Sequence, residues 1–250
     1  MDPLLDFTGK VVLITGAASG FGAQLAEEFS KRGAKLVLGD INEPGLEAVA
    51  SNLPGDATTV LCDVSHERDC QAMVEAAVEI YGRLDIAINN AGGGHPMGSI
   101  HTLTEDIMDQ QFALNTKGVM FGMKHQIAQM LKQEDGTILN VSSMAGLGAS
   151  PKIGAYGAAK HAVIGLTKTA AVEYAKKGIR VNAVCPFFAL TPLVTDSVLG
   201  ESQDFLKQGA PMKRLGETEE ITNLMVMLCS PGNSYMTGQA IAIDGGVSAL

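Results

Sequence analysis

Short apolar segments alternate with longer segments of helical periodicity along this 250-residue chain. The first two apolar segments, VVLIT and KLVLGD, are nearly continuous apolar runs rather than strict alternations of apolar and polar residues. Continuous runs are typical of parallel strands that are covered on both faces. The alternation therefore predicts an α/β fold, with one doubly wound, mostly parallel, seven-stranded sheet and helices on both of its faces.

The apolar segments predict strands at residues 10–15, 35–40, 59–63, 84–89, 137–142, 180–185 and 240–244. The intervening segments predict helices at residues 20–32, 43–52, 67–81, 104–132, 155–176 and 217–228. One irregular segment, residues 187–217, interrupts the rhythm, and a loop of that length is often a functional lid. Because no repeat or linker divides the sequence, residues 1–250 are predicted to form a single domain, with residues 187–217 as its substrate loop.

Composition argues against several functional classes. The formal net charge of −9 opposes binding to nucleic acid or to anionic membranes, which needs a basic surface. No apolar run reaches membrane-spanning length, and the first residues lack the basic-then-apolar pattern of a signal peptide, so a cytoplasmic protein is expected. The cysteines show no CxxC spacing and are predicted to be buried thiols, with no metal site: Cys62, Cys70, Cys185 and Cys229.

Small and hydrogen-bonding residues follow nearly every predicted strand. In a doubly wound sheet, ligands bind outside the carboxyl ends of the strands. Those ends carry Thr15-Gly16, Asp40, Asp63, the Asn-Asn-Ala-Gly run at residues 89–92, Ser142-Ser143 and Cys185-Pro186. Together they predict a crevice that binds a polar ligand.

A glycine-rich turn joins the first predicted strand to the first predicted helix. It contains Gly16, Ser19, Gly20, Phe21 and Gly22. Glycines there permit a tight turn and a close approach of the backbone to a pyrophosphate, whose charge the helix N-terminus stabilises. The turn follows a buried strand and opens an amphipathic helix, which is the context of a dinucleotide-binding site.

Asp40, at the end of the second predicted strand, indicates which dinucleotide binds. An acidic residue there can bind the ribose hydroxyls of adenosine, and a helix-capping role near Asn42 is the alternative. A phosphate on that ribose would add about −1.5 to −2 charges beside the carboxylate. No Lys or Arg occurs between Gly16 and Gly22, or just after Asp40, to offset this charge. NAD is therefore the predicted cofactor, in preference to NADP.

Tyr156 and Lys160 stand four residues apart in a predicted helix and so share one of its faces. A free tyrosine titrates near pH ~10. An ammonium ~4 Å away, at an effective dielectric of ~20, favours the phenolate by about 4 kcal/mol, or roughly three pKa units. The pair therefore predicts a lowered pKa for Tyr156 and a role as general acid or base, with a solvated helix face as the alternative.

These motifs together resemble the short-chain dehydrogenase/reductase family in its compact single-domain form, over about residues 10–246. The resemblance rests on the glycine turn, the Asn-Asn-Ala-Gly run and the Tyr-x-x-x-Lys motif. It implies catalytic roles for Asn115, Ser143, Tyr156 and Lys160. Ser143 is preferred to Ser142 because the family's serine lies thirteen residues before its tyrosine. Besides the turn and Asp40, it implies NAD contacts at Ile41, Asp63, Val64, Asn90, Ala91, Gly92, Tyr156, Lys160, Pro186, Ala189 and Thr191.

The resemblance implies hydride transfer between a nicotinamide and the carbon of a ketone or secondary alcohol. Ser143 would orient the reacting oxygen, and Tyr156 would exchange a proton with it. Lys160 would lower the tyrosine pKa and bind the nicotinamide ribose, and Asn115 would hold a water beside Lys160. A homotetramer is common in this family and is expected here.

One departure from the family concerns the substrate. The usual Pro-Gly after the sixth strand is replaced by Pro186-Phe187. Phe187 is expected to wall the substrate pocket, with packing in the core as the alternative. The predicted substrate-binding residues are mostly small or apolar: Gly94, Ser143, Ala145, Ile153, Tyr156, Phe187 and Phe188. They predict a hydrophobic or cyclic secondary alcohol or ketone.

Two other functions are weighed against this one. A 3-oxoacyl-thioester reductase would usually take NADPH, which Asp40 opposes. A non-catalytic NAD(H)-binding regulator would be expected to carry a broken Ser/Tyr/Lys set, and here the set is intact. His95, after the Gly-Gly-Gly run at 92–94, either contacts substrate or lies on the surface.

Overall fold

The computed structural model of the protein describes residues 3–195 and 203–250. In these residues seven strands form one sheet in the order β3-β2-β1-β4-β5-β6-β7, and every neighbouring pair is parallel. The strands are β1 Val11–Thr15, β2 Lys35–Asp40, β3 Ala57–Leu61, β4 Ile86–Asn89, β5 Gly136–Val141, β6 Ile179–Pro186 and β7 Ala240–Ile243. The predicted doubly wound sheet is confirmed, and it is parallel throughout.

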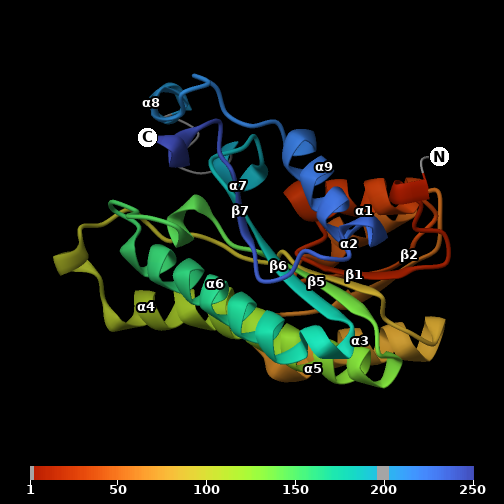
Figure 1. Ribbon diagram of the computed structural model, residues 1–250. Coiled ribbons are helices and arrows are strands. Elements are labelled where there is room, and N and C mark those ends of the chain that lie inside the picture. Colours follow the sequence, from red (N-terminus) through yellow and green to blue (C-terminus); the bar gives the residue numbers. More distant parts are fainter. Residues whose placement is uncertain (1–2, 196–202) are drawn as a thin grey trace.

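Helices cover both faces of the sheet (Figure 1), with α1, α2 and α9 over one face and α3, α5 and α6 over the other. The α-helices are α1 Gly20–Lys31, α2 Glu43–Ser51, α3 Glu67–Tyr81, α4 Glu105–Gln111, α5 Gly118–Gln133, α6 Gly154–Tyr174, α7 Pro192–Thr195, α8 Gln203–Gly209 and α9 Thr218–Cys229. Short 3-10 helices lie at Pro3–Leu5, Ile100–Thr102, Met144–Gly146, Ala175–Lys177, Pro231–Asn233 and Val247–Ala249.

A separate apolar core packs against each face of the sheet. In β1, Val12 and Ile14 belong to the core beneath α1 and α9, whereas Val11 and Leu13 belong to the core beneath α3, α5 and α6. Both faces of this strand are thus buried, which explains its continuous apolar run. All four cysteines lie in the described ranges and are free and buried, as predicted.

The predicted strand at residues 59–63 lies two residues earlier, at Ala57–Leu61. The side chain of Asp63 ends the strand pairing, because its Oδ1 accepts hydrogen bonds from the amide and the hydroxyl of Ser65, at 2.9 and 2.7 Å. The amide of Asp63 bonds the Asp69 carboxylate at 3.2 Å. The chain therefore turns away from the sheet at a carboxylate that binds its own backbone.

The long helix predicted at residues 104–132 is interrupted. α4 ends at Gln111, a π-helical segment spans Phe112–Lys117, and α5 begins at Gly118. Segments of this kind break the regular hydrogen-bond ladder of an α-helix and are frequent at functional sites. Asn115 is fully buried within this one.

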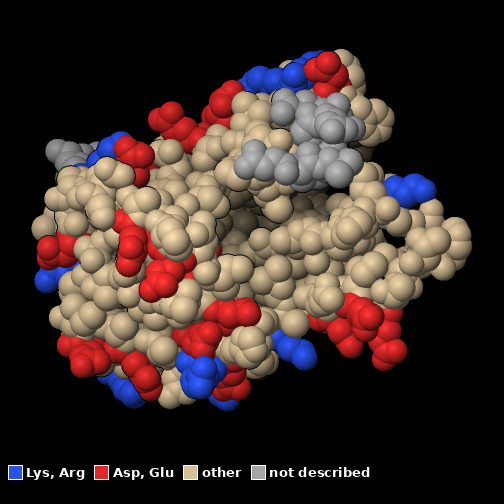
Figure 2. All heavy atoms as spheres, turned by 180° about the vertical axis from the view of Figure 1, so that it is seen from behind, with Lys and Arg blue, Asp and Glu red and all other residues tan. Residues whose placement is uncertain are grey.

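The segment at residues 187–217 is more regular than expected, since it contains α7 and α8. Its described part has a small apolar cluster of its own, in which Val194, Leu206 and Leu215 are buried against Phe188 and Leu190. Figure 2 shows acidic side chains over the face opposite to that of Figure 1 and a hollow near the centre of that face. No helix in the described ranges is long and apolar enough to cross a membrane.

Candidate active site

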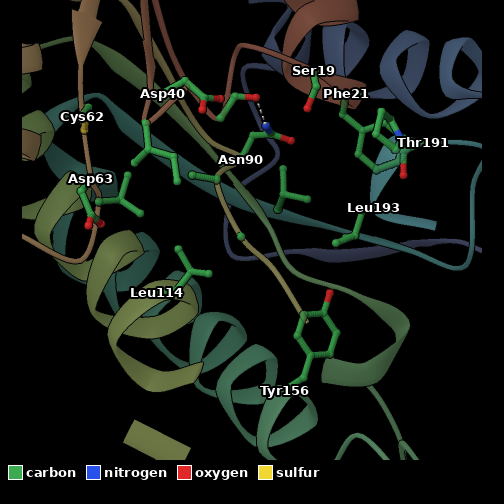
Figure 3. A pocket seen from close by; sticks show the side chains of 18 of the residues that line it. Ser19, Phe21, Asp40, Cys62, Asp63, Asn90, Leu114, Tyr156, Thr191 and Leu193 are labelled. Carbon is green, nitrogen blue, oxygen red and sulfur yellow. Dashed lines mark hydrogen bonds between the residues drawn. The ribbon is translucent and has the colours of Figure 1, made fainter. Parts of the chain in front are cut away.

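A cavity of about 340 Å³ opens at the carboxyl ends of the strands (Figure 3). The predicted cofactor residues that line it are Gly16, Ser19, Gly20, Phe21, Asp40, Ile41, Asp63, Val64, Asn90, Ala91, Gly92, Tyr156, Lys160 and Thr191. Three further predicted contacts, Gly22, Pro186 and Ala189, are not part of the lining. Residues that also line the cavity are Cys62, Leu114, Val141, Pro192 and Leu193.

The glycine turn is tied to the end of β4. The Thr15 hydroxyl accepts from the amides of Asn90 and Ala91, both at 3.0 Å, and the Asn90 side chain donates to the carbonyls of Thr15 and Gly16, at 2.9 and 3.1 Å. Gly16 has φ +68°, and a Cβ there would lie 2.9 Å from the Ala91 Cα. Only glycine therefore permits both this backbone conformation and this close approach.

Gly22 does not line the cavity because it packs beneath the turn. A Cβ at this position would clash with the carbonyl of Gly16. Gly22 thus lets α1 pack closely against the turn, while Ser19 precedes the helix without a side-chain capping bond. The N-terminus of α1 faces the cavity, as a pyrophosphate-binding site requires.

Asp40 is held by two backbone amides. Its Oδ2 accepts from the Ala18 amide and its Oδ1 from the Asn42 amide, both at 2.9 Å. Asn42, not Asp40, caps α2, because its own side chain accepts from the Gly45 amide at 3.2 Å. The carboxylate is therefore fixed at the cavity wall and does not serve as the helix cap.

Charge is distributed unevenly along the cavity. Asp40 and Asp63 lie near one end and Tyr156 near the other (Figure 3). Burial alone would raise the pKa of Asp63, but hydrogen bonds from Ser65 and the nearby His66 hold it below its usual value. Among the lining residues of the described chain, Lys160 is the one cation. No lining cation is therefore available to a phosphate beside Asp40.

Tyr156, Lys160 and Ser143 meet at the other end of the cavity. α6 carries the first two on one face, and the Lys160 Nζ lies 5.6 Å from the centre of the Tyr156 ring. The Ser143 hydroxyl lies close enough to Tyr156 to act on the pKa of its phenol. The Lys160 Nζ donates to the Val141 carbonyl at 2.9 Å. By contrast, the Ser142 hydroxyl is buried and donates to the Lys160 carbonyl, so Ser143 is the serine that faces the tyrosine.

The prediction that Lys160 lowers the pKa of Tyr156 is wrong for this arrangement. Burial raises the pKa of Tyr156, and the nearby Ser143 hydroxyl offsets only part of that effect. Burial also lowers the pKa of Lys160 to about 8, and its ammonium is directed to the Val141 carbonyl. Desolvation of both groups thus outweighs the attraction between them.

Asn115 holds the glycine run rather than standing free in the site. Its Nδ2 donates to the Gly93 carbonyl at 3.0 Å, and its Oδ1 accepts from the Gly93 amide at 3.2 Å. A Cβ on Gly92 would lie 2.7 Å from the Asn115 Oδ1 and 3.2 Å from the Lys160 Nζ. The π-helical segment therefore places this amide beside the lysine, against a backbone that only glycine allows.

The predicted substrate residues occupy two places. Tyr156 lines the cavity, whereas Ser143 stands beside the tyrosine and is not part of the lining. Ala145 is buried just beyond Ser143. Gly94 is exposed and Ile153 is half-buried directly before α6. Phe187 and Phe188 instead line a second, apolar cleft of about 300 Å³, with Phe205, Leu206, Gln208 and Gly209 on α8.

Phe187 lies outside the two main cores. It is half-buried, and its ring packs edge-on against Phe188 with the centroids 4.8 Å apart. Its amide donates to the Ile243 carbonyl at 3.1 Å, which anchors it where β6 ends. The ring thus faces the cleft beneath α8.

Sequence reasoning missed lining residues that include two neighbours of predicted site residues and one strand end. Cys62, Leu114 and Val141 each stand next to a predicted site residue or at the end of a strand. Position alone was the available signal, because their apolar character indicated core. His95 is half-buried, and its Nδ1 donates to the Pro96 carbonyl at 2.8 Å, so its side chain is not freely exposed.

Comparisons with known proteins agree with this geometry. The family model described as enoyl-(acyl carrier protein) reductase matches residues 16–248. An uncharacterized oxidoreductase of Thermotoga maritima is 41% identical, with 98% of this chain and 100% of that protein covered. A 3-oxoacyl-[acyl-carrier-protein] reductase of the same organism is 38% identical, covering 96% and 98%. Levodione reductase of Leifsonia aquatica is 36% identical, covering 99% and 97%.

Solved structures show the same fold with two different cofactors. A 3-ketoacyl-(acyl-carrier-protein) reductase of Brucella melitensis, complexed with NADH, superposes with a TM-score of 0.92 at 37% identity, over 97% of this chain and 100% of that one. ElxO with NADP bound superposes with a TM-score of 0.91 at 34% identity, over 96% and 99%. With its parallel sheet, its glycine turn and its nearly full-length relatives, this chain belongs to the short-chain dehydrogenase/reductase family.

Proposed function

We propose that the protein is an NAD-dependent oxidoreductase that interconverts a secondary alcohol and a ketone. The observation that carries this proposal is one cavity with two chemically distinct ends. A glycine turn and a fixed carboxylate lie at one end, and Tyr156 and Lys160 lie at the other, with Ser143 beside the tyrosine. A dinucleotide needs the first end, and proton transfer to a reacting oxygen needs the second.

The residues present fit NAD. The backbone at Gly16 and the N-terminus of α1 offer room and partial positive charge for a pyrophosphate. Asp40 presents a carboxylate suited to ribose hydroxyls, and no cation of the described lining stands beside it. Ile41 and Val64 supply apolar walls suited to an adenine. NADP would place a 2′-phosphate against the Asp40 carboxylate.

Each catalytic side chain has a distinct role. When bound, NAD accepts or supplies the hydride. Ser143 hydrogen-bonds the reacting oxygen, and Tyr156 gives that oxygen a proton or removes one. Because the pKa of Tyr156 is raised, the phenol holds its proton at neutral pH and is ready as a donor for ketone reduction. Alcohol oxidation needs the phenolate and is expected to accelerate as pH rises.

Lys160 and Asn115 organise this centre. Lys160 is buried beside Tyr156 and places its ammonium where it can bind the nicotinamide ribose. Its charge also stabilises the phenolate once that forms. Asn115 holds the glycine run at residues 92–94 against the lysine, which keeps this wall of the cavity in place.

The substrate is proposed to be hydrophobic or cyclic. Beyond Ser143 and Tyr156 the candidate contacts are small or apolar, and Phe187 and Phe188 line an apolar cleft with α8. Apolar walls with few polar groups are typical of sites for small molecules. Levodione reductase, which is similar over nearly its whole length, supports levodione as the first substrate to test.

The test is a steady-state comparison of cofactors and substrates. NADH and NADPH oxidation are measured with cyclic and open-chain ketones, and NAD+ reduction with the matching secondary alcohols. The proposal predicts turnover with NADH and the highest kcat/KM for hydrophobic ketones. A strong preference for NADPH would contradict the cofactor, and no turnover across the series would contradict the reaction.

A 3-oxoacyl-thioester reductase is the second candidate. It is favoured by similarity to reductases of that name, one of which was solved with NADH. An acetoacetyl thioester in the same assay separates the two, because this candidate predicts that the thioester outperforms every free ketone. A non-catalytic regulator, the third possibility, would bind NADH with no turnover of any of these compounds.

We also propose a homotetramer in the cytoplasm. Exposed apolar side chains on α5 and α6, namely Met120, Leu131 and Val172, provide surface for subunit contacts, whereas Met123 and Met130 are buried in the core. Four free thiols suit a reducing compartment. Sedimentation equilibrium measures the assembly, and a monomer at micromolar concentration would contradict it.

A further inference from the structure

A chain of buried polar side chains crosses the interior below the active site. Its members are Asn89 on β4, Asn140 on β5, Gln126 on α5 and Thr167 on α6, and each is at most 3% exposed. We call these four residues the amide network. Most of the surrounding core is apolar, so polar groups are not needed here to fill space. Buried polar networks make packing specific when every member has a partner.

The network is continuous from one helix to the other. Asn89 and Gln126 form a reciprocal pair, with Nδ2 to Oε1 at 3.1 Å and Nε2 to Oδ1 at 2.8 Å. Asn89 also donates to Asn140 at 2.8 Å, and these two residues face each other in the register of β4 and β5. Asn140 donates to the Thr167 hydroxyl at 2.9 Å, and that hydroxyl donates to the Val163 carbonyl at 2.8 Å.

Each member lies on an element that carries part of the proposed site. Asn89 directly precedes Asn90, and Asn140 stands three residues before Ser143. Gln126 lies on α5, which continues from the π-helical segment that holds Asn115. Thr167 follows Lys160 by seven residues, so the two share one face of α6.

Directional bonds constrain these helices in a way that apolar contacts do not. An amide pair needs its donors and acceptors in register, whereas methyl groups tolerate a small rotation or slide. α5 also approaches β4 closely, since a Cβ on Gly122 would lie 2.5 Å from the Asn89 Oδ1. A rotation of either helix would therefore break the network.

We propose that the amide network sets the rotation of α5 and α6 against β4 and β5, and so positions the catalytic residues. Thr167 positions Tyr156 and Lys160, and Gln126 positions the segment of Asn115. This inference rests on the proposed function for the roles of those residues. None of the four network residues lines the cavity, so their effect on turnover acts through the helices.

The test compares two isosteric substitutions, Thr167→Val and Thr222→Val. Both threonines are fully buried in helices and donate to a backbone carbonyl of the preceding turn. Thr222 lies on α9, on the opposite face of the sheet, and among the described residues it has no side-chain hydrogen-bond partner. The pair thus matches chemistry and burial and differs in the network.

Thr167→Val should lower kcat by about tenfold, because small displacements of catalytic groups cost one to two powers of ten in rate. The KM for NADH should stay within about twofold. Thr222→Val should lower the melting temperature by a similar amount to Thr167→Val and leave kcat unchanged. Thr167→Ser, which keeps the hydroxyl, should restore most of the rate. Equal kcat in the two valine variants would overturn the proposal.

Hydrogen–deuterium exchange on the same proteins separates this idea from the proposed function. Thr167→Val should accelerate exchange in residues 154–165, the start of α6, and Thr222→Val should not. If wild type turns over no substrate, the proposed function fails and the exchange result decides the positioning role alone. Unchanged exchange at residues 154–165 in Thr167→Val would then overturn it.

Discussion

Lys160→Met should abolish turnover while it raises the free energy of unfolding. Lys160 is 3% exposed, and burial lowers its pKa from 10.5 to about 8. At pH 7 this difference corresponds to about 3 kcal/mol of lost stability. Methionine has a similar length without the charge, but it leaves the Val141 carbonyl without its donor, at a cost of about 1–3 kcal/mol. The net expectation is a gain of up to about 2 kcal/mol.

The pH dependence gives the sharper test. Between pH 8 and 10.5 the unfolded chain binds the lysine proton more often than the folded protein, so the wild-type stability due to this group rises with pH. The advantage of Lys160→Met should therefore be largest below pH 8. It should shrink by about 2 kcal/mol between pH 7 and pH 9.5.

Urea unfolding of wild type and variant at both pH values measures this difference, because other titrating groups cancel in the comparison. Lys168→Met is the matched control, since Lys168 is exposed on the same helix. It should change stability little and equally at both pH values. A Lys160→Met protein no more stable than wild type at pH 7, with a gap that does not vary with pH, would refute the reasoning.

Four further substitutions test the site. Tyr156→Phe should lower kcat by at least about 10²–10⁴ with an unchanged melting temperature, and near-normal turnover would contradict the mechanism. Asp40→Ser should reduce the preference for NADH by one to two powers of ten in kcat/KM. A wild-type preference for NADPH would contradict the role of Asp40 as the ribose-binding carboxylate. Phe187→Gly should raise KM for hydrophobic substrates, since a buried phenyl contributes roughly 1.5–3 kcal/mol, and should favour bulkier substrates over smaller ones. A lower melting temperature with an unchanged order of substrate preference would exclude Phe187 from the pocket. Gly22→Ala should destabilise by about 1–3 kcal/mol through its backbone clash, whereas Gly165→Ala, with nothing within 4 Å, should not; equal melting temperatures would contradict the packing argument.

The sheet was predictable because its signal is local. β1 and β2 are apolar on both faces, and only a covered parallel strand explains such runs. The end of β3 was misplaced, since an apolar run continues to Cys62 while the side chain of Asp63 turns the chain away. The π-helical segment was not predictable either, because its residues keep a helical pattern. The bond that Asn115 makes from this segment goes to Gly93, twenty-two positions away.

In the site, too, local features were predictable from the sequence and long-range features were not. Tyr156 and Lys160 were found from their spacing, which a helix converts directly into a shared face. Their pKa values were not, because desolvation depends on everything packed around them. Gln126 and Thr167 look like ordinary helix residues in the sequence, and their partners come from β4 and β5.

The position of β1 between β2 and β4 affects how binding and unfolding are coupled. The cavity takes Asp40 from the end of β2 and Tyr156 from α6, so a ligand there contacts both the early and the late parts of the chain. Such a ligand must dissociate before either part can separate from the other. At a concentration of 100 times its Kd it would add about 2.7 kcal/mol to the stability of the molecule. Thermal-shift titrations with NAD and with NADP would therefore rank the two dinucleotides before any substrate is identified.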